Sequence, residues 1–211
     1  MTARTATKSS DFAVQVSSKG LGYNMPQKAG RKLWAPMWLM AIMAFPVAFI
    51  IGLVRSGTIA DGGSEATILS LLHTQAGIMF IGFAAVFAAI SFAIARILGE
   101  FRKGGGEVQE LVGDKVVTLK MPATVKVFLL GMMMSMVAIL VASVIHFVWA
   151  AQLSGGSVTV ADAESAFIAL EAVRRLGVAV YLVAITFGLA TITRVLRFQA
   201  IRIRELAGIT S

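Results

Sequence analysis

Residues 124–152 read TVKVFLLGMMMSMVAILVASVIHFVWAAQ, and this stretch decides the class of fold. It contains a single charged residue, Lys126, which lies close to its start. About 20 predominantly apolar residues form a helix long enough to cross the roughly 30 Å hydrocarbon core of a bilayer. Pro122, just before the stretch, suits the first turn of a helix because that turn leaves its backbone N–H groups unpaired. The stretch is therefore predicted to be a transmembrane helix.

Three further segments have the same character, namely residues 34–54, 68–96 and 166–194. The chain of 211 residues is 57% hydrophobic and 14% charged, with a mean hydropathy of +0.83, which argues against a soluble globular domain. No small-residue cleavage site follows the first segment, so we expect a retained span and not a cleaved signal peptide. The sequence predicts an all-α membrane protein with a four-helix transmembrane bundle over residues 33–200.

The basic residues are distributed unevenly between the two sides of this predicted bundle. Of 19 Lys and Arg residues, six precede the first span, six lie between Arg96 and Lys126, and four follow the fourth span. The positive-inside rule then places both termini and the loop 97–123 in the cytoplasm of a multi-pass cell-membrane protein. The net charge of +8 belongs to the cytoplasmic face, where anionic lipid explains it. Nucleic acid is not expected as a partner.

The segments outside the spans are polar. Residues 1–32 are predicted to be a disordered cytoplasmic tail, and residues 201–211 a basic cytoplasmic C-terminal tail that continues the fourth helix. In the cytoplasmic loop 97–123, Gly113 and Asp114 separate two strand-like runs, which predicts a small β-hairpin between the second and third spans. Such a hairpin is either a self-contained surface loop or a docking element for a partner subunit.

The chain has two histidines, and helix arithmetic places them at one depth. His73 lies 23 residues from Arg96, and His146 lies 20 residues from Lys126. At about 1.5 Å per residue these separations are roughly 34 Å and 30 Å of helix. Both imidazoles are therefore expected near the outer edge of the hydrocarbon, where they arrive from antiparallel spans.

Two neutral imidazoles from facing helices form a ligand pair for the iron of a b-type haem. The absence of cysteine excludes c-type haem and cysteine-ligated iron–sulfur clusters, but haem b needs no cysteine. We therefore expect His73 and His146 to be axial haem ligands. The same layer is predicted to hold the residues that complete a haem site: Arg174 and Arg175 beside the propionates, with Arg55 a poorer candidate, and Gly77 and Ala142 leaving room for the macrocycle.

Simpler interpretations of the two histidines stay open. His73 could lie at the membrane interface with its ring partly wet, and His146, which adjoins Phe147, could belong to an aromatic belt. A zinc or copper site would need more ligands than two imidazoles. The candidates for such ligands are a methionine and three acidic residues, Asp61, Glu65 and Glu171.

Two other features favour packing over chemistry. In the run Met132–Met136, three consecutive methionines point different ways around a helix, so core packing explains the run better than a copper path does. Glu171 precedes Arg174 by three residues, which is the spacing of an ordinary intrahelical ion pair.

These observations lead to a prediction of function. The chain is expected to be a cytochrome b-like subunit of a membrane oxidoreductase complex, non-catalytic itself, that moves single electrons between an outer partner and quinone or another subunit. The alternative is a cofactor-free structural or assembly subunit of a larger membrane complex. A transporter or channel is disfavoured because no acidic residue lies deep in a span.

Overall fold

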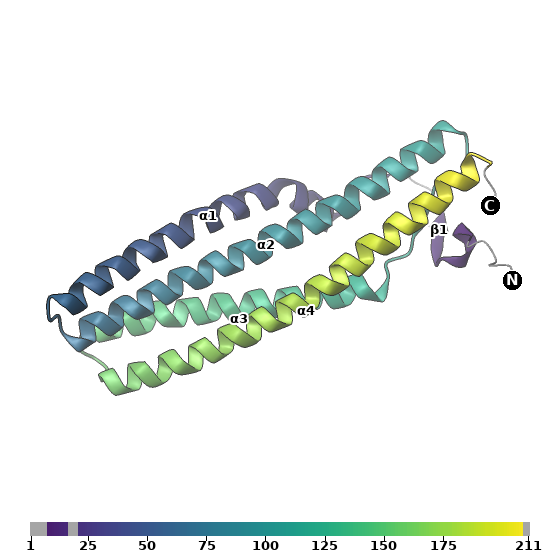
Figure 1. Ribbon diagram of the computed structural model, residues 1–211. Coiled ribbons are helices and arrows are strands. Elements are labelled where there is room, and N and C mark those ends of the chain that lie inside the picture. The colour runs from purple at the N-terminus through teal and green to yellow at the C-terminus, as the bar shows by residue number, and fades with distance from the viewer. Residues whose placement is uncertain (1–7, 17–20, 209–211) are drawn as a thin grey trace, which may run out of the picture.

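The computed structural model describes residues 8–16 and 21–208. Predictions on the remaining parts of the two tails, residues 1–7, 17–20 and 209–211, lie outside the described residues. Four long helices dominate the structure (Figure 1): α1 Met25–Ala60, α2 Glu65–Leu111, α3 Ala123–Ser154 and α4 Val160–Leu206. Each is long and apolar enough to cross a membrane. The predicted all-α bundle of four long apolar helices is thereby confirmed.

Short turns at one end of the bundle make α1 and α2, and α3 and α4, antiparallel neighbours (Figure 1). Gly62 and Gly156 follow the ends of α1 and α3 with φ angles of 70° and 67°, which glycine adopts without strain. The next helices begin at capped residues. The side chains of Ser64 and Thr159 accept hydrogen bonds from backbone N–H groups in the first turns of α2 and α4.

The central helix is α2, which contacts each of the other three, while α1 packs mainly along α2 and α3 along α4. Gly30 allows the close approach of α1, because a Cβ atom there would lie 2.5 Å from the carbonyl oxygen of Phe92 in α2. In the core, Tyr181 of α4 stacks on Phe87 of α2 with their ring centroids 3.6 Å apart. The Tyr181 hydroxyl donates to the Phe87 carbonyl, so this buried polar group is satisfied.

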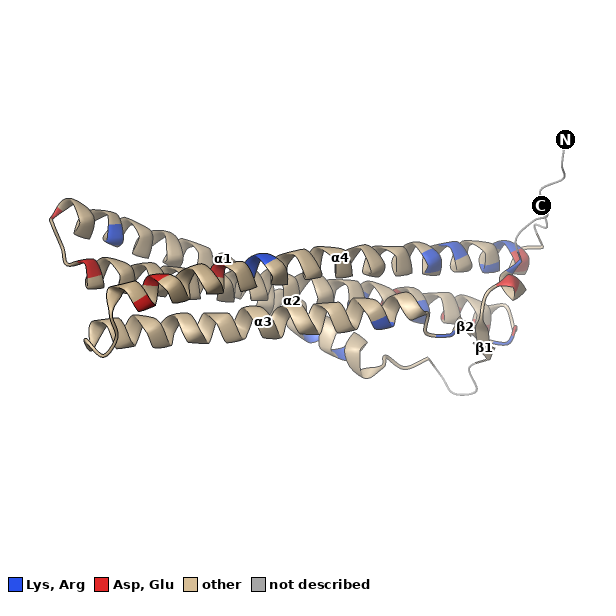
Figure 2. Cartoon of the chain, turned by 90° about the horizontal axis from the view of Figure 1, so that it is seen from below, with Lys and Arg blue, Asp and Glu red and all other residues tan. Residues whose placement is uncertain are grey.

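The bundle is much longer than a bilayer is thick. Helices α2 and α4 contain 47 residues each, about 70 Å at 1.5 Å per residue. At least one end therefore projects into water. Lys and Arg residues gather along α2 and α4 at the end that carries β1 and β2 (Figure 2). The described parts of both tails meet there, since the backbone N–H of Ser9 donates to the Glu205 carboxylate at 2.7 Å.

The predicted β-hairpin is wrong, although a small antiparallel sheet does exist. Strand β2, Val117–Leu119, pairs with β1, Val14–Val16, from the N-terminal tail. The residues that were expected to form the other strand belong to the last turns of α2. Gly113, with φ 74°, follows the helix end, and its N–H and that of Asp114 bond to the carbonyls of Glu110 and Gln109. This is a Schellman motif, which uses glycine for the same reason as a hairpin turn does.

The predicted tails and loop also contain more structure than expected. Within residues 1–32, α1 already begins at Met25 behind an Asn24–Gln27 capping box, and Ser9–Asp11 form the 3-10 helix η1. About half of the predicted loop 97–123 is helical, because α2 continues to Leu111. The predicted helical continuation into residues 201–211 is confirmed as far as Leu206.

Candidate functional site

The structure brings the two histidines together in the half of the bundle that carries the short turns. His73 lies two turns into α2, His146 lies two turns before the end of α3, and both side chains are fully buried. Their Nδ1 atoms are 2.9 Å apart, which is a direct hydrogen bond between the two imidazoles. The pair therefore lies at one level between antiparallel helices.

A carbonyl of α4 determines which nitrogen atoms carry hydrogen. The Nε2 atom of His73 lies 3.1 Å from the carbonyl oxygen of Ala163, which only accepts, so this Nε2–H donates. A neutral His73 then has a lone pair on Nδ1, and the Nδ1–H of His146 donates to it. The remaining nitrogen, His146 Nε2, is a buried acceptor without a hydrogen-bond partner among the described residues.

Aromatic rings surround the pair. The Phe80 ring meets the His146 ring edge to face with centroids 4.9 Å apart, and Phe167 contacts both imidazoles at 5.4 and 5.5 Å. Trp149 stacks over His73 at 6.4 Å. The site therefore excludes bulk water, and a polar atom in it depends on the protein for its hydrogen bonds.

Two serine hydroxyls bond α2 to α3 on either side of the histidines. Ser143, three residues before His146, donates to the Gly77 carbonyl at 2.7 Å. Ser70, three residues before His73, donates to the Ala150 carbonyl at 3.0 Å. Each acceptor lies four residues after the histidine of its own helix. The motif is therefore two-fold symmetric, with the imidazole contact at its centre and the two helices held together both above and below it.

The small residues of the site serve this close packing. A Cβ atom on Gly77 would lie 3.0 Å from the Phe147 ring, so the space at Gly77 is occupied by that side chain. Ala142 is only 1% exposed and belongs to the main hydrophobic cluster with Ile139. The room that was predicted for a macrocycle at these two residues is filled by protein.

The Arg174 side chain comes near the imidazole pair, because the Phe80 ring that it contacts also contacts the His146 ring. Phe167 of α4 contacts both imidazoles, and Arg174 lies seven residues further along the same helix, about 10 Å. Arg174 pairs with Glu171 and lies over the Phe80 ring at 5.6 Å.

The other two candidate arginines also make no described hydrogen bond to either histidine. Arg175 is exposed on the surface of α4. Arg55 is half-buried in α1, and its Nε atom has no hydrogen-bond partner among the described residues. The ion pair of Glu171 with Arg174 is the intrahelical pair that its spacing indicates.

The packed pair does not fit a haem as it stands. Iron with an axial imidazole about 2 Å away on each side needs roughly 4 Å between the two nitrogen atoms. The facing nitrogens are 2.9 Å apart, and the serine bonds hold the two helices closed around them. Nor do residues 8–16 and 21–208 contain a group of three or more His, Asp or Glu side chains that could hold a metal ion.

The methionine run packs as its helical positions indicate. Met132 and Met136 lie against the main hydrophobic cluster, whereas Met133 and Met134 are 62% and 59% exposed. The run therefore has an inner and an outer face, and the outer one suits contact with lipid.

Comparison with protein-family models, with curated proteins and with solved structures finds no match for this chain. The interpretation of the site therefore depends on its own geometry. Sequence reasoning missed the hydrogen bonds made by Ser70, by Ser143 and by the carbonyl of Ala163. A signal for the serines was present, since SLLHTQAG and SVIHFVWA share a serine three residues before the histidine and a small residue four after it. The Ala163 carbonyl carries no side-chain signal.

Proposed function

We propose that the chain is a cofactor-free structural subunit of a larger membrane complex, and that the His73–His146 pair is a hydrogen-bonded clasp between its helices. The observation that supports this most strongly is the two-fold arrangement of serine and histidine bonds between α2 and α3. Apolar side chains gain little by leaving lipid for one another, so membrane helices associate through packing and interhelical hydrogen bonds. A clasp of this kind supplies both.

The clasp also explains why histidine is tolerated at these positions. A buried imidazole is costly unless its nitrogens are hydrogen-bonded. Of the four ring nitrogens, three have partners, and the bond to Ala163 extends the network to α4. One connected set of hydrogen bonds therefore joins α2, α3 and α4 near the end of the bundle that carries the two short turns.

The opposite end of the bundle is the proposed docking region for other subunits. There the side chain of Gln109 bonds to both backbone groups of Val117, and Arg202 of α4 bonds to Gln109 and Asp114. These contacts hold α2, the sheet and α4 in one arrangement. A projecting region with a defined shape suits a partner protein better than a mobile tail does.

Haem binding by an electron-transfer subunit is the second candidate. It is favoured by one specific observation, namely two buried imidazoles that face each other from antiparallel helices. A bound haem would supply one-electron redox chemistry, with quinone or another subunit as the partner. In this proposal His73 and His146 separate by about 1 Å more to ligate the iron, and the serine bonds beside them loosen.

One set of variants separates the two proposals. The full-length protein is expressed with added haem, and its oxidised and reduced absorbance spectra are recorded for the wild type, His73→Ala, His146→Ala and the double variant. The unfolding free energy of each is measured in detergent. Thr74→Ala is the matched control, because the Thr74 hydroxyl bonds within α2, to the Ser70 carbonyl.

If the pair is a clasp, the absorbance spectra should show no Soret band. The unfolding free energies should give a coupling energy between the two histidines of about 0.5–2 kcal/mol. Thr74→Ala should have an unfolding free energy close to that of the wild type. A Soret band that disappears in both single variants would reject the clasp and support haem ligation. Additive effects without any haem would reject both proposals for this pair.

Membership of a complex is tested separately. The chain has a mass of 22.3 kDa, so native electrophoresis of gently solubilised membranes from the source organism should show it in a much larger assembly. Migration as a free monomer at its natural expression level would contradict the subunit proposal.

A further inference from the structure

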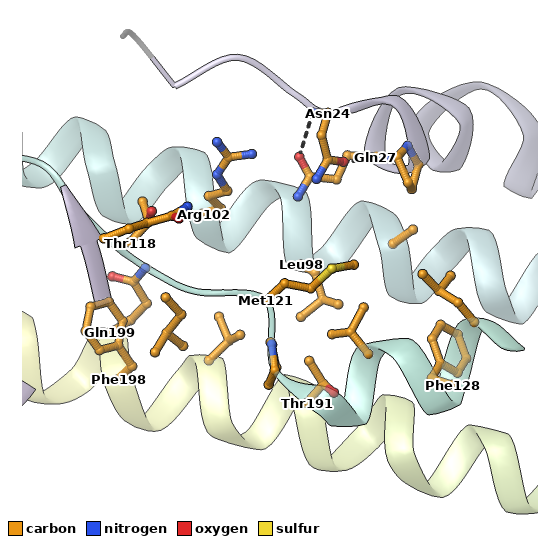
Figure 3. Close-up of a pocket in the computed structure, with 18 residues that line it drawn as sticks. Asn24, Gln27, Leu98, Arg102, Thr118, Met121, Phe128, Thr191, Phe198 and Gln199 are labelled. Carbon is orange, nitrogen blue, oxygen red and sulfur yellow. Dashed lines mark hydrogen bonds between the residues drawn. The ribbon is translucent and has the colours of Figure 1, made fainter. Parts of the chain in front are cut away.

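A cavity of about 260 Å³ lies where α1, α2, α3 and α4 meet the two short strands (Figure 3). Its apolar wall includes Leu98, Phe128 and Val195. Its polar lining includes Arg102 of α2, Thr118 of β2 and Gln199 of α4, which are labelled in Figure 3. An apolar cavity with a few converging polar groups is the usual form of a ligand site.

Two polar atoms of the residues that line this cavity lack partners. Thr118 is only 4% exposed, and its hydroxyl makes no hydrogen bond with the described residues. The Oε1 atom of Gln199 is also buried and unpaired, although its amide nitrogen donates to the Phe101 carbonyl at 3.2 Å. Since buried polar groups are nearly always paired in folded proteins, these two atoms indicate a missing donor or acceptor.

The charge of the cavity points to an anion. Arg102 is half-buried and takes part in none of the five salt bridges of the described residues, whereas its neighbour Lys103 pairs with Glu107. Gln27 of α1, which also lines the cavity, uses its Oε1 atom to accept from the backbone N–H of Asn24, which leaves its amide group free to donate. A guanidinium group and an amide together suit a phosphate oxygen.

The level of the cavity points to a lipid headgroup. Three lining residues directly adjoin the basic residues that mark the ends of three spans: Ala95 beside Arg96, Val125 beside Lys126 and Val195 beside Arg194. The phosphates of a bilayer lie at this boundary. The first turn of α3, which also lines the cavity, has no side-chain cap at Pro122, and such a helix start favours a negative group.

We infer that this cavity binds one anionic phospholipid with a hydroxyl-bearing headgroup, such as phosphatidylglycerol. The phosphate faces Arg102, a headgroup hydroxyl donates to Gln199, and the start of an acyl chain lies against Leu98 and Phe128. The cavity is smaller than the roughly 300–1,000 Å³ of most ligand sites, so the rest of the lipid stays in the bilayer. This site is independent of the function proposed for the histidines.

The test uses the full-length protein in nanodiscs of phosphatidylcholine that contain increasing fractions of phosphatidylglycerol. Native mass spectrometry after release counts the lipids that remain bound. Arg102→Gln removes the cation, and Thr118→Val removes the hydroxyl at nearly constant shape. Lys126→Gln is the matched control, because Lys126 is exposed at the same level and does not line the cavity. A parallel arm adds oleate, which has an acyl chain and a carboxylate but no phosphate.

We expect the wild type and Lys126→Gln to retain one phosphatidylglycerol, and Arg102→Gln to retain it about tenfold less well, the order expected for a lost bond to a charged group. Thr118→Val should weaken retention by a smaller factor, and oleate should not compete. Equal losses in Arg102→Gln and Lys126→Gln would overturn the inference in favour of diffuse charge attraction. Equal retention of phosphatidylcholine, or displacement by oleate, would overturn it as well.

Discussion

The hydroxyl group of Ser143 on α3 donates to the carbonyl of Gly77 on α2 at a distance of 2.7 Å. Ser143 is 2% exposed, so no water competes for this bond. Because the bond lies next to the imidazole contact, the separation of α2 and α3 at the histidines is fixed by a polar bond as well as by packing. The strength of the proposed clasp can therefore be measured one bond at a time.

Ser143→Ala should destabilise the bundle by about 0.6–1 kcal/mol, the usual value of an interhelical hydrogen bond in a membrane protein. The measurement is reversible unfolding in mixed micelles. Val144→Ala is the control, since Val144 is 61% exposed on the outer surface of α3. Equal stability of the two variants would show that the serine bond does not hold the helices.

Gly30→Ala should loosen α1 from α2, because its Cβ atom would lie 2.5 Å from a backbone oxygen that cannot rotate away. Such a clash costs about 1–3 kcal/mol when the helices must move apart. Gly57→Ala, in the same helix, meets nothing within 4 Å and should be neutral or stabilising because alanine is the better helix former. Limited proteolysis and thermal unfolding compare the two. A Gly30→Ala protein as stable as Gly57→Ala would contradict the packing of α1.

The spans were predictable because a helix that crosses lipid must be long and apolar, and this property can be recognised in each segment separately. The meeting of the histidines was also predictable, since two antiparallel helices of known rise bring equal numbers of residues to one level. The carbonyl of Ala163 as the partner of His73 was not, because a backbone acceptor carries no side-chain signal.

The small sheet could not be predicted from the sequence, for a different reason. Strands β1 and β2 have three residues each and come from distant segments, so their pairing depends on tertiary contacts and not on local propensity. Gly113 correctly indicated a change of chain direction, but a glycine at such a position is compatible with two different structures. A positive φ suits a hairpin turn and the end of a helix equally, and only the long-range contacts of Gln109 with Val117 distinguish them.

Arg202→Gln should open the region where α2, β2 and α4 meet. The guanidinium group bonds to Gln109 at 3.2 Å, Asp114 at 2.6 Å and Glu205 at 3.4 Å, a fork that a shorter uncharged side chain does not reproduce. Amide hydrogen exchange at Val117, whose N–H donates to Gln109, should become roughly tenfold faster, the equivalent of about 1.4 kcal/mol of local stability.

Arg204→Gln is the matched control for this change, because Arg204 is exposed in the last turn of the same helix. It should leave the exchange at Val117 unchanged. If Arg202→Gln also left the exchange at Val117 unchanged, the bonds of Arg202 would not hold this region together. The proposed docking region would then lose its main support.

The direction of the chain in the membrane can be tested directly because the protein has no cysteine. Lys115→Cys places one thiol at the basic end, beyond α2, and Ser157→Cys places one in the turn between α3 and α4; both positions are exposed. The positive-inside rule predicts that a membrane-impermeant maleimide labels Ser157→Cys in intact cells, but labels Lys115→Cys only after the membrane is opened. The reverse pattern would place the basic end outside. The histidine pair would then lie near the cytoplasmic surface, because it is fixed in the same half of the bundle as the turn that contains Ser157.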